Sequence, residues 1–61
     1  MSVVGDANRD LVIQMISVRA SCTRETVARL FDGKSVDELN AFYKDVGDGK
    51  KAIQYGKIVE L

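Results

Sequence analysis

The chain has 61 residues, which is enough for one small domain and too few for a multidomain enzyme. Hydrophobic residues make up 46% of it and charged residues 30%, a balance that favours a folded globule over a disordered segment. Nine basic and nine acidic residues give a formal net charge of zero. This neutrality excludes a polycationic packaging protein and an acidic mimic of DNA.

The composition also argues against catalysis and against a bound cofactor. The chain has no histidine, so it lacks the commonest general base near neutral pH and the commonest ligand of transition metals. Its single cysteine, Cys22, can form neither an intrachain disulfide nor a cysteine-based zinc site. We therefore expect a protein that is not an enzyme and that holds no metal or cofactor.

The expected location is the cytoplasm, because a lone thiol is typical of a reducing compartment. The most apolar stretch, residues 11–18, is interrupted by Gln14 and Ser17. It is far shorter than the roughly 20 residues that a membrane-spanning helix needs, so no membrane contact is expected. The chain has no recognisable linker, which predicts a single domain over residues 1–61 with residues 1–7 as a flexible arm.

The first predicted helix covers residues 8–20, with Asn8 or Asp6 as its N-cap. Its apolar spacing indicates a helix with one buried face, although its many β-branched residues leave a strand as the alternative. The second predicted helix covers residues 24–31, with Thr23 as its N-cap and Gly33 just beyond its end. A capping box of Ser35 and Glu38 starts a third helix over residues 36–46.

Residues 50–61 fit two structures. Ile53, Tyr55, Val59 and Leu61 alternate as in a strand, whereas other apolar positions fit a helix that Gly56 weakens by about 1 kcal/mol. The predicted fold class is therefore all-α, a small three-helix bundle with a fourth helix or a short β tail at the C-terminus. The predicted core consists of Leu11, Val12, Met15, Ile16, Val27, Leu30, Phe31, Val36, Leu39, Phe42, Tyr43 and Val46.

The first two predicted helices are joined by only three residues, which is the plan of a helix-turn-helix. Ser17 and Ala20 supply the small side chains that the crossing of the two helices needs. The segment SCTRETVARLFDGK, residues 21–34, resembles the recognition helix of lactose-repressor-type headpieces. Over residues 13–34 the chain is also similar to small phage Cro and repressor proteins.

This resemblance implies a small DNA-binding transcriptional regulator of the phage or plasmid type, with a helix-turn-helix core. By position, Thr23, Arg24, Glu25 and Arg29 are then the residues that reach base edges in the major groove. Arg can bond guanine at two atoms, and Glu can accept from cytosine. Arg19 and Lys34 flank the helix and are the candidate phosphate contacts.

A homodimer is expected with this function, because two copies place their reading helices one DNA turn apart, about 34 Å. The candidate dimer contact is the apolar tail, Ile53 to Leu61. A second interpretation stays open. In it, Glu25 and Arg29 are only an intrahelical ion pair.

Residues 27–35, followed by Leu39 and Tyr43, also resemble the second-to-third helix passage of Myb/SANT-type domains. In that register the working helix is the acidic stretch 36–46, which phosphate repels. The alternative function is therefore a small protein–protein interaction module, an inhibitor or adaptor of a host complex, that does not bind DNA.

Overall fold

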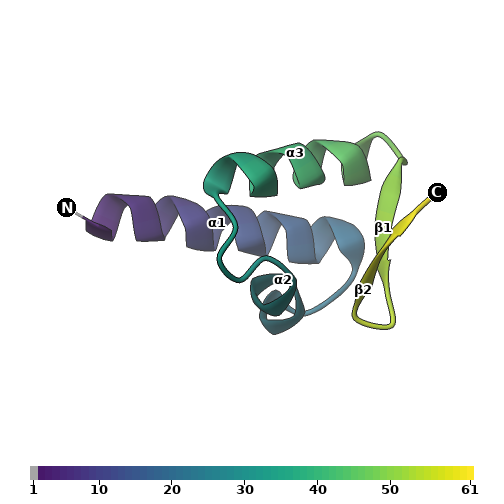
Figure 1. Cartoon of the computed structure of the whole chain (residues 1–61), viewed down its shortest axis with the longest axis horizontal. Helices are drawn as coiled ribbons and strands as arrows, with labels where there is room; N and C mark the ends of the chain where they lie inside the picture. Colours follow the sequence, from purple (N-terminus) through teal and green to yellow (C-terminus); the bar gives the residue numbers. More distant parts are fainter. Residues whose placement is uncertain (1) are drawn as a thin grey trace.

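The computed structural model describes the backbone of residues 2–61 and the side chains of residues 8–61. Its elements are helices α1 (Ser2–Ala20), α2 (Arg24–Leu30) and α3 (Val36–Gly47), then strands β1 (Lys51–Gln54) and β2 (Lys57–Glu60). Helix α1 runs along the long axis of the molecule, with α3 along one side of it and the short α2 on the other (Figure 1). The predicted three-helix bundle is present, and the tail is the β alternative.

Helix α1 begins at Ser2, so the predicted start at residue 8 is wrong, and Met1, the first residue of the predicted flexible arm, lies outside the described residues. Asp6 and Asn8 lie inside the helix and are not its N-cap. Helix α1 contains one glycine, which costs only about 1 kcal/mol relative to alanine, and the chain has no proline that would delay the start of the helix.

Helices α2 and α3 begin where their capping residues predict. The Thr23 hydroxyl accepts a hydrogen bond from the Thr26 amide at 3.2 Å, and the Ser35 hydroxyl accepts one from the Glu38 amide at 3.3 Å. Each bond satisfies one of the amides that a helix start leaves without a partner. The sequence therefore predicts both starts correctly, and α2 ends one residue earlier than expected.

The C-terminal tail is an antiparallel hairpin in which Ile53 lies opposite Ile58, and Gln54 lies opposite Lys57 at the turn. A turn at Tyr55 and Gly56 separates the strands, so the tail is not the single strand that its alternation indicated. The pairing places Ile53 and Ile58 on one face of the sheet and Lys57 and Val59 on the other. Only Ile53 is buried among the helices.

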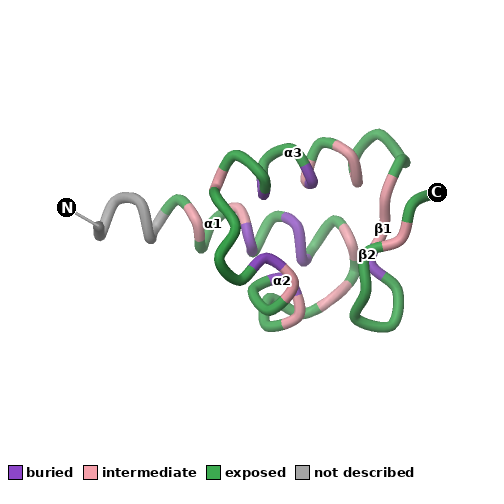
Figure 2. Tube along the Cα trace, in the orientation of Figure 1, coloured by how far each residue is buried: buried purple, intermediate pink, exposed green. Residues whose placement is uncertain are grey.

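The core lies between the three helices and β1 (Figure 2). Two of its aromatic rings, Phe31 and Phe42, pack with their centroids 5.0 Å apart. Seven apolar side chains are buried: Ile13, Ile16, Val27, Phe31, Leu39, Phe42 and Ile53. Most of the predicted core residues are buried or pack against this cluster, which makes the prediction correct for α2 and α3.

The prediction is wrong for one face of α1. Leu11 is 56% exposed and Met15 is exposed, whereas Ile13 takes a place in the core that the sequence assigned to them. Helix α1 is apolar around most of its circumference, so its spacing alone does not decide which side meets α2 and α3. Within the described residues, no helix has the length and apolar character needed to cross a membrane.

Candidate nucleic-acid interface

The turn between α1 and α2 closes with a specific hydrogen-bond pattern. The Cys22 amide donates to the Ser17 carbonyl at 3.0 Å, and the Ser21 amide donates to the Val18 carbonyl at 3.3 Å. Ser21 has a φ of 59°, the left-handed conformation that glycine adopts most easily at this position. Together these bonds form a Schellman motif, which ends α1 and turns the chain into α2 within three residues.

Helix α2 is held against α1 by one side and leaves the other free. Val27 is fully buried, and Leu30 packs against the core. Arg24, Glu25 and Arg29 are all exposed. Of the six predicted contact residues, α2 therefore carries three, all with exposed side chains.

Arg24 shares its surroundings with two carboxylates. A hollow between α1 and α2 is lined by Asp10, Ile13, Arg24, Glu25 and Ala28. A phosphate that approached Arg24 would meet the negative charge of Asp10 and Glu25 as well. Arg24 is therefore the weaker of the two α2 arginines as a contact to DNA.

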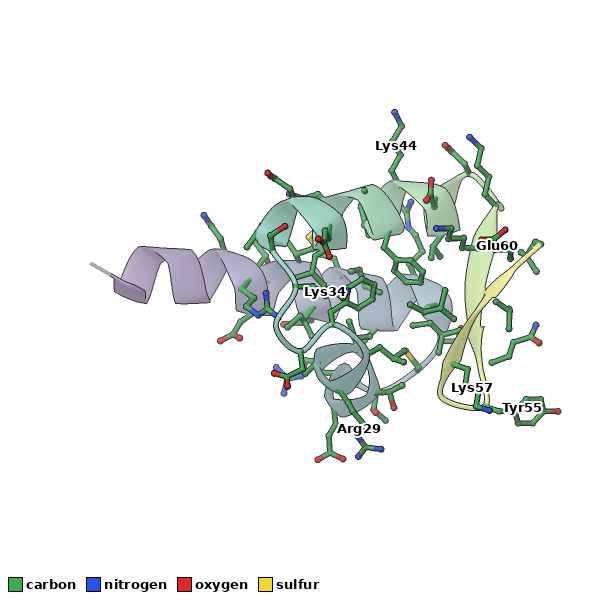
Figure 3. All side chains as sticks on the ribbon, in the orientation of Figure 1. Arg29, Lys34, Lys44, Tyr55, Lys57 and Glu60 are labelled. Carbon is green, nitrogen blue, oxygen red and sulfur yellow. The ribbon has the colours of Figure 1, made fainter. Side chains whose placement is uncertain are left out.

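Arg29 projects from the outer side of α2, away from α1 and α3 (Figure 3). The expected Glu25–Arg29 ion pair does not form: among the described side chains the one ion pair joins Lys51 Nζ to Asp45 Oδ2 at 3.6 Å. The guanidinium of Arg29 thus remains available to an external acceptor, and its five donors suit a guanine edge or a phosphate.

Arg19 lies apart from the α2 arginines. Its guanidinium carbon is 4.2 Å from the centre of the Tyr43 ring, a cation–π contact that fastens the end of α1 to α3. The guanidinium also occupies the space beside Gly47, where an added Cβ would come within 2.0 Å of Nη1. The structure therefore does not bring Arg19 together with Arg24 and Arg29.

The remaining two predicted residues lie at the ends of α2. The hydroxyl of Thr23 caps the helix and lies 2.9 Å from the Thr26 hydroxyl, so it is already engaged within the chain. Lys34 is exposed in the segment that joins α2 to α3, and its ammonium is held by no ion pair to a described side chain. Thr23 precedes α2 in the chain and Lys34 follows it. The positive charge of Lys34 is not paired with any described carboxylate.

Arg9 orders the end of α2, and the sequence analysis did not find it. Its guanidinium donates to the carbonyl oxygen of Phe31 at 2.7 Å and to that of Lys34. These bonds tie the middle of α1 to the segment after α2. No local pattern signals them, because the partners are more than 20 residues apart in the chain.

The hairpin turn carries the second feature that sequence reasoning missed. Tyr55 is 99% exposed and has a φ of 54°, and Gly56 follows with a φ of 72°. Positive φ at both central residues is the pattern of a type I′ turn, whose first position normally holds Asn, Asp or Gly. The signal available in the sequence was Tyr-Gly between two β-rich runs.

A second hollow, of about 330 Å³, lies between α1 and α3 and is mainly apolar. Leu11, Met15 and Val18 from α1 and Tyr43 from α3 line it, together with Gln14 and Arg19. Val18 is 75% exposed. This groove is separate from the free side of α2.

Cys22 has no sign of reactivity. It is half-buried and packs against the core, and burial raises the pKa of its thiol. A thiol with a raised pKa stays protonated at neutral pH and is a poor nucleophile or metal ligand. Among the residues that the structure describes, no three His, Cys, Asp or Glu side chains are grouped so that they could hold a metal ion.

Comparison of the chain with known protein families, curated proteins and solved structures gives no match.

Proposed function

We propose that this protein is a small DNA-binding transcriptional regulator that places α2 in the major groove. The observation that carries the proposal is the junction of α1 and α2, a three-residue Schellman turn with left-handed Ser21, followed by a helix that leaves Arg29 free. A helix held rigidly by its neighbour and presenting unpaired donors is what base-edge reading requires.

The proposal ranks the contact residues. Arg29 is the main reading residue, because its donors have no partner within the described residues and no carboxylate pairs with it. Arg24 contributes less, since Asp10 and Glu25 share its hollow. Lys34 remains a candidate phosphate contact. Arg19 is no longer proposed as one, because its guanidinium stacks on Tyr43.

Because the net charge of the chain is zero, we expect its affinity for DNA to depend on only a few phosphate contacts. The logarithm of the observed binding constant falls linearly with the logarithm of the salt concentration, with a slope of about −0.9 for each phosphate that the protein neutralises. Because only a few free cations flank α2, we expect a shallow salt dependence for one protomer, with a slope of no more than about −4.

The test is a titration of the protein against a random pool of duplex DNA at two salt concentrations. We expect Arg29→Ala to weaken binding by about 1–3 kcal/mol and to relax the preference at one base position, with a smaller loss for Arg24→Ala. Lys44→Ala is the matched control, since it removes one positive charge from α3, where Lys44 points away from α2 (Figure 3).

Wild-type protein that is folded and yet fails to bind duplex DNA at the lower salt would overturn the proposal. Equal losses for Arg29→Ala and Lys44→Ala would show that only net charge matters, and Arg29 would lose its assigned role.

A second candidate is a protein–protein interaction module, and the groove between α1 and α3 favours it. Leu11, Met15 and Val18 expose apolar area there, and Tyr43 lines the opposite wall. The same groove also fits a homodimer better than the whole tail does, because Ile53 is buried in its own core and only Tyr55, Ile58 and Leu61 of the tail's large apolar side chains stay exposed. Analytical sedimentation of the wild type and of Val18→Glu tests the self-contact. A dimer in this groove should become a monomer in Val18→Glu, and a monomeric wild type would contradict it.

A further inference from the structure

Tyr55 lies at a position where the rest of the chain does not stabilise its side chain. Its side chain is 99% exposed, so it has almost no packing within the molecule. Its left-handed backbone is unfavourable for a residue with a bulky side chain, because Cβ then crowds the backbone. An exposed residue that is also strained is a candidate for contact with an external partner.

The neighbours of Tyr55 define the chemistry that the turn can recognise. Gln54 and Lys57 lie opposite each other at the ends of the two strands, and both are exposed. The turn therefore presents an aromatic ring, a phenol, an amide and an ammonium group. The nearest carboxylate along β2 is Glu60, which lies at the far end of the hairpin, opposite Lys51.

The position of the turn relates it to α2. Arg29, Lys57 and Tyr55 all lie along the lower edge of the molecule in Figure 3, and Lys44 lies at the upper edge. An ammonium group binds a backbone phosphate, and an aromatic ring beside it packs on the neighbouring sugar.

We propose that the hairpin turn, residues 54–57, is a second contact to the same DNA, in which Lys57 binds a backbone phosphate and Tyr55 packs on the adjacent sugar. This inference rests on the proposed function of α2. It adds a second element to the interface and explains why a tyrosine occupies a position that favours asparagine or glycine.

The test uses Tyr55→Asn, which suits the left-handed position and removes the aromatic ring. We expect the midpoint of urea unfolding to stay the same or rise, while affinity for duplex DNA falls about fivefold or more. Most substitutions that weaken binding by damaging the fold would lower both quantities, so opposite changes separate contact from stability.

Lys57→Ala is the second variant, with Lys44→Ala as its charge-matched control. Lys57→Ala should lower affinity and reduce the salt slope by about 1, and Lys44→Ala should do neither. Fluorescence of Tyr55, compared with that of the Tyr55→Asn protein, should also change on addition of DNA.

The outcomes separate this inference from the proposed function. If wild-type protein binds DNA and Arg29→Ala weakens it, but Tyr55→Asn and Lys57→Ala bind like wild type, the hairpin contact is overturned and the role of α2 stands. If the folded wild type does not bind DNA, both are overturned, and the turn becomes a candidate contact for a protein partner.

Discussion

At the scale of single residues, some side chains hold the fold together through a partner three residues away in the chain, and others through a partner more than 20 residues away. Thr23 and Ser35 cap helices because their hydroxyls meet an amide three residues ahead, a relation that can be read from the sequence. Arg9 and Arg19 each contact residues more than 20 positions away, and nothing in their sequence neighbourhood distinguishes them from solvated arginines. The sequence therefore predicts a phosphate contact for Arg19, whereas in the structure its guanidinium stacks on Tyr43.

The Arg9 contact gives a stability prediction. Arg9→Ala removes two charge-assisted hydrogen bonds to backbone carbonyls, and we expect unfolding to become easier by about 1–2 kcal/mol in urea titrations. Arg9→Lys keeps the charge but not the fork of donors, so it should recover only part of the loss. Equal stability of Arg9→Ala and wild type would mean that solvent replaces both bonds without cost.

At the scale of elements, the bounds of α2 and α3 follow from their capping residues, whereas the start of α1 and the orientation of its buried face do not. The bounds of α2 and α3 agree with their caps to within a residue. Helix α1 has apolar residues on two sides, and only packing against α2 and α3 selects Ile13 and Ile16 over Leu11 and Met15. The sequence predicts the candidate DNA surface on α2 because the buried side of that helix is clear from its spacing, whereas residues 50–61 fit both a helix and a strand.

The turn between α1 and α2 is the element on which the proposed interface depends most. Ser21→Gly should leave the free energy of unfolding unchanged or raise it slightly, because glycine adopts a φ near 59° without strain. Ser21→Val should lower it by more than about 1 kcal/mol, since a β-branched residue is a clear outlier in that region. Thermal melts followed by circular dichroism check both, and a stable Ser21→Val protein would mean that the turn adopts another conformation.

At the scale of the whole molecule, the small core leaves little stability to spare. A single core in a chain of this size supplies roughly 3–5 kcal/mol. The sequence predicts the three-helix arrangement correctly, because the apolar residues of α2 and α3 fall on one side of each helix. The place of Ile53 in the core was not predicted, since it depends on the hairpin folding back against α3.

A matched pair of leucines tests the core assignment. Leu39 is fully buried, so Leu39→Ala should cost about 2–5 kcal/mol and leave most of the protein unfolded. Leu11 carries the same side chain but is 56% exposed, so Leu11→Ala should change stability by no more than about 0.5 kcal/mol. Urea unfolding of both variants is the measurement, and equal losses would contradict the observed orientation of α1.

The contact between Arg19 and α3 has a consequence for how the sequence can vary. The guanidinium that stacks on Tyr43 fills the space beside Gly47, so a side chain at position 47 and an arginine in this conformation exclude each other. A lineage that gained alanine at position 47 would gain helix propensity in α3 and release the end of α1 from it. An alanine at position 47 would therefore be accommodated only by a shift of the Arg19 side chain, whose flexible end is the part that meets the added Cβ.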